Sequence, residues 1–412
     1  MSKEKVSARA WIIVSIVWIG YVVVNLANFS IGIMMPDIQA ELALTVTQTG
    51  WLSASSWILK ALFSIPIALL LSRFNAKNII QAVFAIVSVG LLLQGFAQNF
   101  VMLFLGRALV YGVAAAILAP LAVVKIKLIP KERMAGINGI ENFTGPLGQV
   151  LGTAVVPFII ATMGTWRNTM ILMGILAIIV TVVWSVCCKK EDGMSEANTT
   201  GKAQKIQFLA PLKEACSHRT VWLLALGWWG TGLIWNAMYS YWPTFVQESY
   251  GIGTEVSGVI LGILPIASII GSLTSPKIAD KIGYDKPMIF IWGFILPVAY
   301  FCMMITSSIP LLCVAVFVAG YGAYAFVPIA FTSIYKIKGI SPQAVSIGMA
   351  MIFTTNGVGG ALGGTLSASL SQSMGLEGAL KVCCLFPLIF GILTLFLPET
   401  GRKAAEKEAM KG

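Results

Sequence analysis

Charged residues are scarce in this chain of 412 residues. Asp, Glu, Lys and Arg together make up only 11% of it, whereas hydrophobic residues make up 57%. Soluble globular domains carry about a quarter of their residues as charged side chains. The composition therefore excludes an ordinary soluble protein and predicts one that is largely embedded in a membrane.

Residues that support enzyme chemistry are also few. The only histidine, His218, lies in a polar gap, so metal clusters and histidine-based catalysis lack their parts. The seven cysteines form no Cys-x-x-Cys pair, and we interpret them as small apolar packing residues. A Gly-x-x-x-x-Gly-Lys-Ser/Thr loop is absent, so nucleotide hydrolysis is not expected to supply energy. We predict no enzyme activity, no metal site and no cofactor.

Long apolar stretches dominate what is present. An α-helix needs roughly 20 apolar residues to cross about 30 Å of hydrocarbon. Twelve such spans lie at residues 11–33, 50–71, 79–97, 101–124, 135–160, 168–187, 220–244, 255–275, 287–306, 309–333, 343–370 and 379–397. The sequence predicts an all-α integral membrane protein with twelve transmembrane helices.

Basic residues are distributed unevenly between these spans. The net charge of +11 could suggest a nucleic-acid partner, but 24 of the 28 Lys and Arg residues lie at the termini and in alternate gaps. An excess of Lys and Arg in cytoplasmic loops is the bias that orients membrane proteins. We therefore expect a multi-pass protein of a bacterial inner membrane, with both termini cytoplasmic, no nucleic-acid partner and a monomeric state.

The second half of the chain repeats the first at a spacing of about 211 residues. Trp18 and Asn25 match Trp229 and Asn236, for example. Four glycines of the fifth span recur with identical spacing in the eleventh: Gly136, Gly145, Gly148 and Gly152 match Gly348, Gly357, Gly360 and Gly364. The longest polar stretch lies between the halves. We predict a six-helix bundle at 1–187, a cytoplasmic linker at 188–218 and a second six-helix bundle at 219–412.

Two parallel six-helix halves are the layout of transporters that work by alternating access, with the substrate near the bilayer midplane. Small residues let membrane helices approach closely, as the contacts of a rocking bundle require. We therefore assign a conformational role to Gly145, Pro146, Gly148, Gly357 and Gly360.

Two loops carry a family motif of the form Gly-x-x-x-Asp-Arg/Lys-x-Gly-x-Arg/Lys. In the copy after the eighth span, Pro276 replaces the first glycine, and the remaining positions fit: Asp280, Lys281, Gly283 and Lys286. In the copy after the second span, Arg73 and Lys77 fit, but Ser72 and Asn75 replace the aspartate and the glycine. Further likenesses follow in order along the spans: Gly106-Arg107, Gly145-Pro146, Trp166-Arg167 and Pro398-Glu399-Thr400.

With these motifs the chain resembles the major facilitator superfamily over essentially its whole length. The resemblance implies two six-helix bundles and a cytoplasmic gate latched by the two loops, with a weaker latch on the N-terminal side because the aspartate is missing. It also implies that Arg107 holds helices together rather than contacting substrate. The stretch from Pro36-Asp37-Ile38 through Gly50-Trp51-Leu52-Ser53-Ala54 to Pro66 is similar to transporters of organic anions, including anion:cation symporters.

Lys60 is the most informative single residue. It lies near the middle of the second span, where an ionised side chain costs at least about 2.5–3.5 kcal/mol. A polar stripe at helical spacing accompanies it: Ser53, Ser56, Trp57 and Ser64. Lys60 either binds an anionic group of the substrate, which we favour, or forms a structural ion pair. The resembling symporters typically have a tyrosine there. Because the repeat position is Ser268, we expect one central cation and hence a monoanionic substrate.

Glu141 is the acidic residue that lies well inside a span. A carboxyl group in a low dielectric favours its protonated form, so Glu141 is a candidate proton carrier. The alternative is an ion pair with Arg133, Lys125 or Lys127.

Aromatic and amide side chains complete the predicted site. In the resembling family, spans 1, 4, 7 and 10 line the central cavity. The further candidates for substrate contact are Trp57, Tyr21, Asn25, Asn28, Trp235, Asn236, Tyr239, Tyr321, Tyr324 and Asn356. One cation among amides and aromatics suits a small carboxylate with an apolar or aromatic body.

The sequence thus predicts a secondary transporter of a small organic monoanion, driven by proton symport or exchange. One alternative is a proton-coupled antiporter that exports amphipathic drugs or metabolites, for which Gly145-Pro146 is a hint. An alternative of another class is a membrane receptor that binds solute without moving it, although we expect such a protein to carry a signalling extension.

Overall fold

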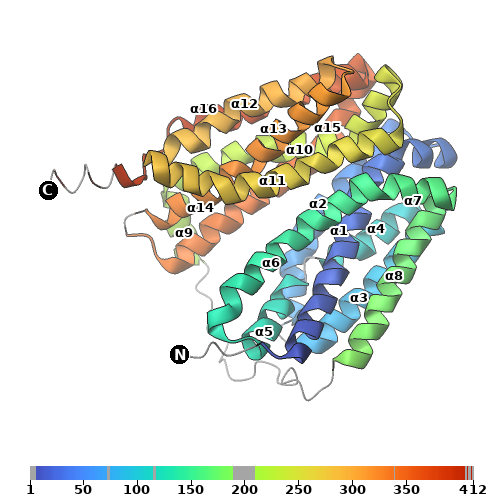
Figure 1. Ribbon diagram of the computed structural model, residues 1–412, viewed down its shortest axis with the longest axis horizontal. Coiled ribbons are helices and arrows are strands. Elements are labelled where there is room, and N and C mark those ends of the chain that lie inside the picture. Colours follow the sequence, from blue (N-terminus) through green and yellow to red (C-terminus); the bar gives the residue numbers. More distant parts are fainter. Residues whose placement is uncertain are drawn as a thin grey trace. The chain divides into compact units, whose positions relative to one another are not determined.

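The computed structural model describes residues 6–71, 75–114, 117–188, 209–337 and 339–403, together with residues 406 and 410. All regular elements in these ranges are helices (Figure 1). The chain divides into two compact units. The N-terminal unit comprises Met1–Gln48 and Ser55–Gln204, and the C-terminal unit comprises Thr49–Ala54 and Lys205–Gly412.

The N-terminal unit contains six spans built from nine elements (blue to green in Figure 1). These are α1 (Ala8–Leu42), α2 (Val46–Leu71), α3 (Ala76–Gly95), α4 (Phe100–Ala114), α5 (Leu118–Leu128), α6 (Lys131–Val150), the π-helix η1 (Leu151–Val155), α7 (Val156–Met163) and α8 (Trp166–Cys187). Residues Thr49–Ala54 of α2 belong to the C-terminal unit. Helices α4 and α5 occupy the fourth predicted span, and α6, η1 and α7 occupy the fifth. Side chains of Ser7, Asn75 and Thr165 cap the starts of α1, α3 and α8.

Close packing in this unit depends on small residues. Helix α1 packs against α6 and α8, and α3 packs against α4 and α8. A Cβ atom added at Gly148 would lie 2.5 Å from Cβ of Asn25, and one at Gly152 would lie 2.6 Å from the carbonyl oxygen of Leu26. These two glycines therefore let the backbones of α6–η1 and α1 touch.

The C-terminal unit contains α9 (Leu209–Ser217), α10 (Arg219–Tyr250), α11 (Thr254–Ile282), α12 (Lys286–Ile305), α13 (Ile309–Ala325), α14 (Val327–Tyr335), α15 (Pro342–Cys383) and α16 (Pro387–Thr394). The tenth span breaks at Phe326, between α13 and α14, where Pro328 lacks the N–H that a continuous helix needs. Gly375 has φ 74° inside α15, which only a glycine adopts without strain, and it separates the eleventh span from the twelfth.

Helix α15 makes its closest approach to α10 at glycines other than the predicted ones. Cβ atoms added at Gly359 and Gly363 would collide with the carbonyl groups of Trp229 and Leu233. Gly357, by contrast, has no atom within 4 Å of an added Cβ. The matched Gly360 contacts α10 in another way, because its carbonyl accepts a hydrogen bond of 2.7 Å from the Asn236 amide.

Eight helical stretches in the described residues are long and apolar enough to cross a membrane. One of them, Ile347–Thr394, contains both the eleventh and twelfth spans. The other three predicted spans coincide with α2, with α4 and α5, and with α10.

The predicted linker at 188–218 is only partly within the described residues. Its end forms α9, which packs on α15. The Glu214 carboxylate accepts hydrogen bonds from the backbone N–H of Ser341, at 2.6 Å, and from its hydroxyl, at 2.7 Å. These bonds hold the helix to the N-terminus of α15, and they lower the pKa of Glu214 below its usual value.

Candidate functional site

Among the described residues of the N-terminal unit, Arg107 is the most deeply buried charged one. It lies on α4 with 0% of its surface exposed. Its Nε donates a hydrogen bond to the hydroxyl of Ser55 on α2, at 2.7 Å, and its guanidinium carbon lies 4.8 Å from the centroid of the Tyr111 ring. Nη1 and Nη2 make no hydrogen bond of normal geometry within the described part of the chain. The guanidinium thus links α4 to α2 through Nε and lies against the Tyr111 side chain of its own helix.

Lys60 lies half-buried on α2. Neither Lys60 nor Arg107 belongs to an ion pair in the described part of the chain. Of the stripe predicted beside Lys60, Ser56 is buried and Trp57 is half-buried, whereas the side chain of Ser64 lies outside the described residues. Arg107 on α4 is a second buried cation of the same unit. The sequence did not reveal the bond between Arg107 and Ser55, because the two residues are 52 positions apart.

Glu141 forms a second charged cluster in the same unit. Its carboxylate lies 2.6 Å from the Lys125 ammonium, with only 18% and 8% of the two side chains exposed. Lys125 also donates to Oδ1 of Asn138, at 2.7 Å, and the indole N–H of Trp18 donates to Glu141, at 3.4 Å. Of the three ion-pair partners that the sequence allowed, the structure selects Lys125.

The predicted polar residues of α1 lie in the packed interior. Asn25 and Asn28 are buried, and Tyr21 is half-buried. The amide of Asn25 donates to the carbonyl of Tyr21, at 2.8 Å, and its Cβ adjoins Gly148. Asn25 therefore contributes to the α1–α6 contact. Gly145 has open space beside it, with only the Tyr21 ring within 4 Å of an added Cβ, and Pro146 follows it inside α6.

In the C-terminal unit the predicted aromatic residues form one cluster. The ring of Trp235 lies 5.1 Å from that of Tyr239 and 5.4 Å from that of Tyr324, between centroids. Tyr321 turns elsewhere, because its hydroxyl shares a hydrogen bond of 2.8 Å with Thr274 and its ring adjoins Trp292. The structure therefore brings together three of the four aromatics predicted on α10 and α13.

The two predicted amides of this unit hold backbone carbonyls. Asn236 donates to the carbonyl of Gly360, at 2.7 Å, and Asn356 donates to that of Trp228, at 3.2 Å. Both bonds join α10 to α15.

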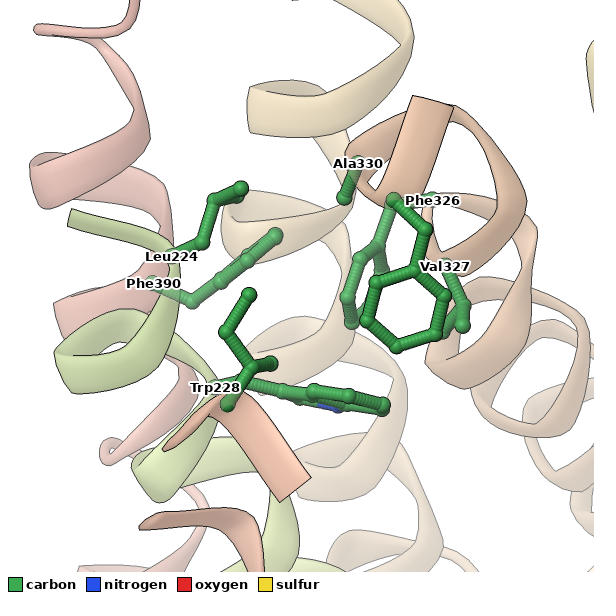
Figure 2. Close-up of a pocket in the computed structure, with 8 residues that line it drawn as sticks. Leu224, Trp228, Phe326, Val327, Ala330 and Phe390 are labelled. Atoms are coloured by element: carbon green, nitrogen blue, oxygen red, sulfur yellow. The ribbon is translucent and has the colours of Figure 1, made fainter. Parts of the chain in front are cut away.

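A second aromatic cluster surrounds Trp228, and sequence reasoning missed most of it. Figure 2 shows Leu224, Trp228, Phe326 and Phe390 turned toward a small pocket whose lining is apolar. Centroids of Phe326 and Phe390 lie 4.2 Å apart, and that of Trp228 lies 6.0 Å from Phe326. Phe326 occupies the break between α13 and α14, so the cluster lies where the tenth span is interrupted. The Val-Pro pair after Phe326 was the available signal.

Of the two predicted gating loops, the first lies partly outside the described residues and the second lies within them. Arg73 lies outside the described residues, and Lys77 is half-buried at the start of α3. In the other loop Asp280 and Lys281 are exposed, and Gly283 has φ 81° after α11.

In the α11–α12 loop, Asp285 makes two short polar contacts, although the sequence pattern did not single it out. Its Oδ2 lies 2.7 Å from both the Lys336 ammonium and the Thr400 hydroxyl. The Glu399 carboxylate accepts from the N–H groups of Asp285 and Lys286, at 2.7 and 3.3 Å, and so caps α12. The residues after α16 are thereby fastened to the α11–α12 loop.

Comparisons with known proteins extend over most of the chain. A family model described as Major Facilitator Superfamily matches residues 17–337. The uncharacterized transporter YybO of Bacillus subtilis (strain 168) is 24% identical over 398 residues, which cover 90% of this chain and 89% of the relative.

Solved structures share the fold at low identity. A bacterial homologue of the human lysosomal transporter Spinster, in an inward-facing and unoccupied conformation, has a TM-score of 0.80 at 17% identity, covering 94% of this chain and 96% of that one. The nucleoside transporter NupG has a TM-score of 0.77 at 14% identity, covering 94% and 98%. The predicted fold, twelve helices in two six-helix bundles, is confirmed.

Proposed function

This chain belongs to the major facilitator superfamily, and we propose that it is a secondary transporter of a small organic anion. Membership makes it a multi-pass membrane transporter and not an enzyme. The substrate class is our proposal, and one observation carries it: Lys60 and Arg107 place two positive charges in the interior of the N-terminal unit without an acidic partner in the described residues.

Such an arrangement is costly without a ligand. An ionised group taken out of water loses solvation worth several kcal/mol unless an opposite charge and hydrogen bonds replace it. In the described part of this unit, the carboxylates of Glu41 and Glu141 form ion pairs with Arg167 and Lys125. A substrate anion would supply the missing negative charge. This supports Lys60 as a substrate-binding residue rather than a structural one.

The body of the substrate is expected to be apolar or aromatic. Trp57 lies three residues before Lys60 on α2, and the C-terminal unit offers the rings of Trp235, Tyr239 and Tyr324. Ligand sites are typically lined by such side chains, with a few polar groups that fix orientation.

Proton coupling through Glu141 is the second part of the proposal. The Lys125–Glu141 pair is nearly buried, so breaking it in one conformation and forming it in another is energetically significant. Protonation of Glu141 removes the attraction that holds Lys125. We therefore propose symport with protons, or exchange, by a monomer working by alternating access, with both termini on the cytoplasmic side of a bacterial inner membrane.

Export of amphipathic drugs by proton antiport is the second candidate. Its supporting feature is the Gly145-Pro146 pair, which lies inside α6. The two candidates differ in whether the cations of the N-terminal unit are needed.

A thermal-shift screen of the purified protein separates them. Ligands that bind the folded state raise its apparent stability by mass action. If carboxylates stabilise the wild type but not Lys60→Ala, the organic-anion proposal stands. If only lipophilic cations or uncharged solutes, nucleosides included, stabilise both proteins equally, drug export replaces it. Uptake of the stabilising solute into proteoliposomes then distinguishes a transporter from a receptor.

A further inference from the structure

We propose that a groove between α12 and α13 binds one acyl chain of a membrane phospholipid. The groove has a volume of about 350 Å³ and is lined by residues of these two helices and of the turn between them. Helix α12, and α13 together with α14, are long and apolar enough to cross a membrane. The site shares no residue with the charged and aromatic clusters that the proposed function uses, and it requires only that the chain is a membrane protein.

Small side chains form the floor of the groove, and larger ones form its walls. Ala299 of α12 and Ala315 of α13 are buried, and Cys302, one turn beyond Ala299, is half-buried. Ile305 and Leu311, by contrast, expose more than half of their surfaces. The space above the small residues therefore opens outward, away from the packed interior of the C-terminal unit.

The chemistry of the lining favours a hydrocarbon occupant over water. Apart from the Cys302 thiol and the Thr306 hydroxyl, the lining side chains are aliphatic. Thr306 is the C-cap of α12, so its hydroxyl lies at the end of the groove next to the turn. A water molecule inside a protein needs two to four polar partners, which this lining does not offer. An apolar group therefore fills the space.

The length of the groove distinguishes an acyl chain from a helix of a partner protein. Its α12 side runs from Ile295 to Thr306, an axial distance of roughly 16 Å. This is half of the roughly 30 Å of hydrocarbon in a bilayer, so the groove extends from the membrane surface at the α12–α13 turn through one leaflet. A partner helix crosses both leaflets and is about 10–12 Å wide, which the groove does not accommodate. A single acyl chain belongs to one leaflet and fits it.

Photo-crosslinking with a defined lipid tests the inference. The full-length protein is reconstituted into phosphatidylglycerol vesicles that contain a phospholipid with a diazirine group midway along one acyl chain. The sample is irradiated either in the vesicles or after repeated washing in dodecyl maltoside, and labelled peptides are identified by mass spectrometry. Helix α8 is the reference, because Ile179 and Val182 expose apolar side chains outside the groove.

A bound chain and lipid on an open surface should differ after washing. In vesicles we expect label on α8 and on α12 and α13. After washing, the wild type should keep about tenfold more label on α12 and α13 than on α8, because a chain held in a groove dissociates more slowly. Cys302→Phe places a ring in the groove and should remove most of the retained label. The matched control Val182→Phe adds a ring to α8 and should keep the wild-type pattern.

A second variant keeps the test decisive. Ile305→Ala combined with Leu311→Ala shortens two walls of the groove, and both side chains are exposed, so the fold does not depend on them. The retained label should fall in this protein as well. Should Cys302→Phe fail to fold, the double variant decides.

Three results would overturn the inference. If washing removes label from α12, α13 and α8 equally, the groove holds no chain. If the retained label persists in both groove variants, the lipid lies elsewhere. If α12 and α13 stay unlabelled even in vesicles, a protein surface covers the groove instead of lipid.

Discussion

The two units share a repeat but fill their interiors with different chemistry. In the N-terminal unit, Lys125 after the fourth span pairs with Glu141 inside the fifth. Its repeat partner in the C-terminal unit, Lys336, pairs instead with Asp285 in a loop, and 40% of its side chain is exposed. By the register of the matched glycines, Phe353 occupies the position of Glu141, and its ring packs 5.5 Å from that of Trp228. At this repeat position, the N-terminal unit has a paired carboxylate and the C-terminal unit has an aromatic ring.

This difference teaches where function is concentrated. Buried charges in a membrane protein are costly and need a reason, whereas buried aromatic rings are stable packing. Our proposal therefore concerns the N-terminal unit, where the charges of Lys60, Arg107 and Glu141 lie. Three substitutions test this comparison, beginning with the largest expected effect, and a fourth prediction concerns a contact within the C-terminal unit.

Arg107→Met should abolish anion transport while leaving the fold intact. The substitution removes a charge that is 0% exposed and keeps a side chain of similar length. Transport of an organic anion into proteoliposomes should fall on the order of 100-fold, because removing a buried charged partner from a ligand site costs about 3 kcal/mol or more. The midpoint of thermal unfolding should not fall, since an uncompensated charge is gone. A lower unfolding midpoint with transport retained would mark Arg107 as structural.

Glu141→Gln should destabilise the N-terminal unit and uncouple transport from the proton gradient. It leaves the nearly buried Lys125 ammonium without its carboxylate, a loss of about 3 kcal/mol in the free energy of unfolding. The double variant Lys125→Met with Glu141→Gln should recover most of this loss, as a double-mutant cycle would measure. Uptake that still follows an imposed pH gradient in Glu141→Gln would remove Glu141 from the coupling role.

Asp285→Asn, the matching change in the C-terminal unit, should cost much less. Its partner Lys336 is exposed enough for water to screen the pair, so a loss of about 1 kcal/mol is expected. Proton dependence of transport should not change. An effect as large as that of Glu141→Gln would erase the distinction between the two halves.

Acidification should loosen the contact of α9 with α15 by a small amount. Ser341 hydrogen bonds lower the pKa of Glu214 in the folded state, with a weaker contribution from His218. A group with a lowered folded pKa stabilises the fold above its unfolded pKa, and that stabilisation disappears as pH falls through the folded value. The loss should therefore occur below the ordinary glutamate value of 4.5. Hydrogen exchange at the N-terminus of α15 should accelerate there in the wild type and already be faster at neutral pH in Glu214→Gln.

Hydropathy and charge bias were sufficient to predict the helices of the fold, because membrane crossing depends on local sequence. Side-chain partners were predicted only where they lie close in sequence, as for Lys125 and Glu141, which are 16 residues apart. The bond between Arg107 and Ser55 depends on how α2 and α4 are rotated, and hydropathy does not report rotation. For the same reason the repeat did not reveal that Gly359 and Gly363 make close contacts of α15 with α10.

Uptake of a labelled organic anion into proteoliposomes is the most direct test of the claim that the cations of the N-terminal unit bind the substrate. The probe is the carboxylate that best stabilises the wild type in the thermal-shift screen. Lys60→Gln is compared with a control, Lys213→Gln, which removes an exposed lysine of α9. We predict saturable uptake by the wild type and by Lys213→Gln, and its loss in Lys60→Gln at an unchanged unfolding midpoint. Equal uptake by all three proteins would contradict the account.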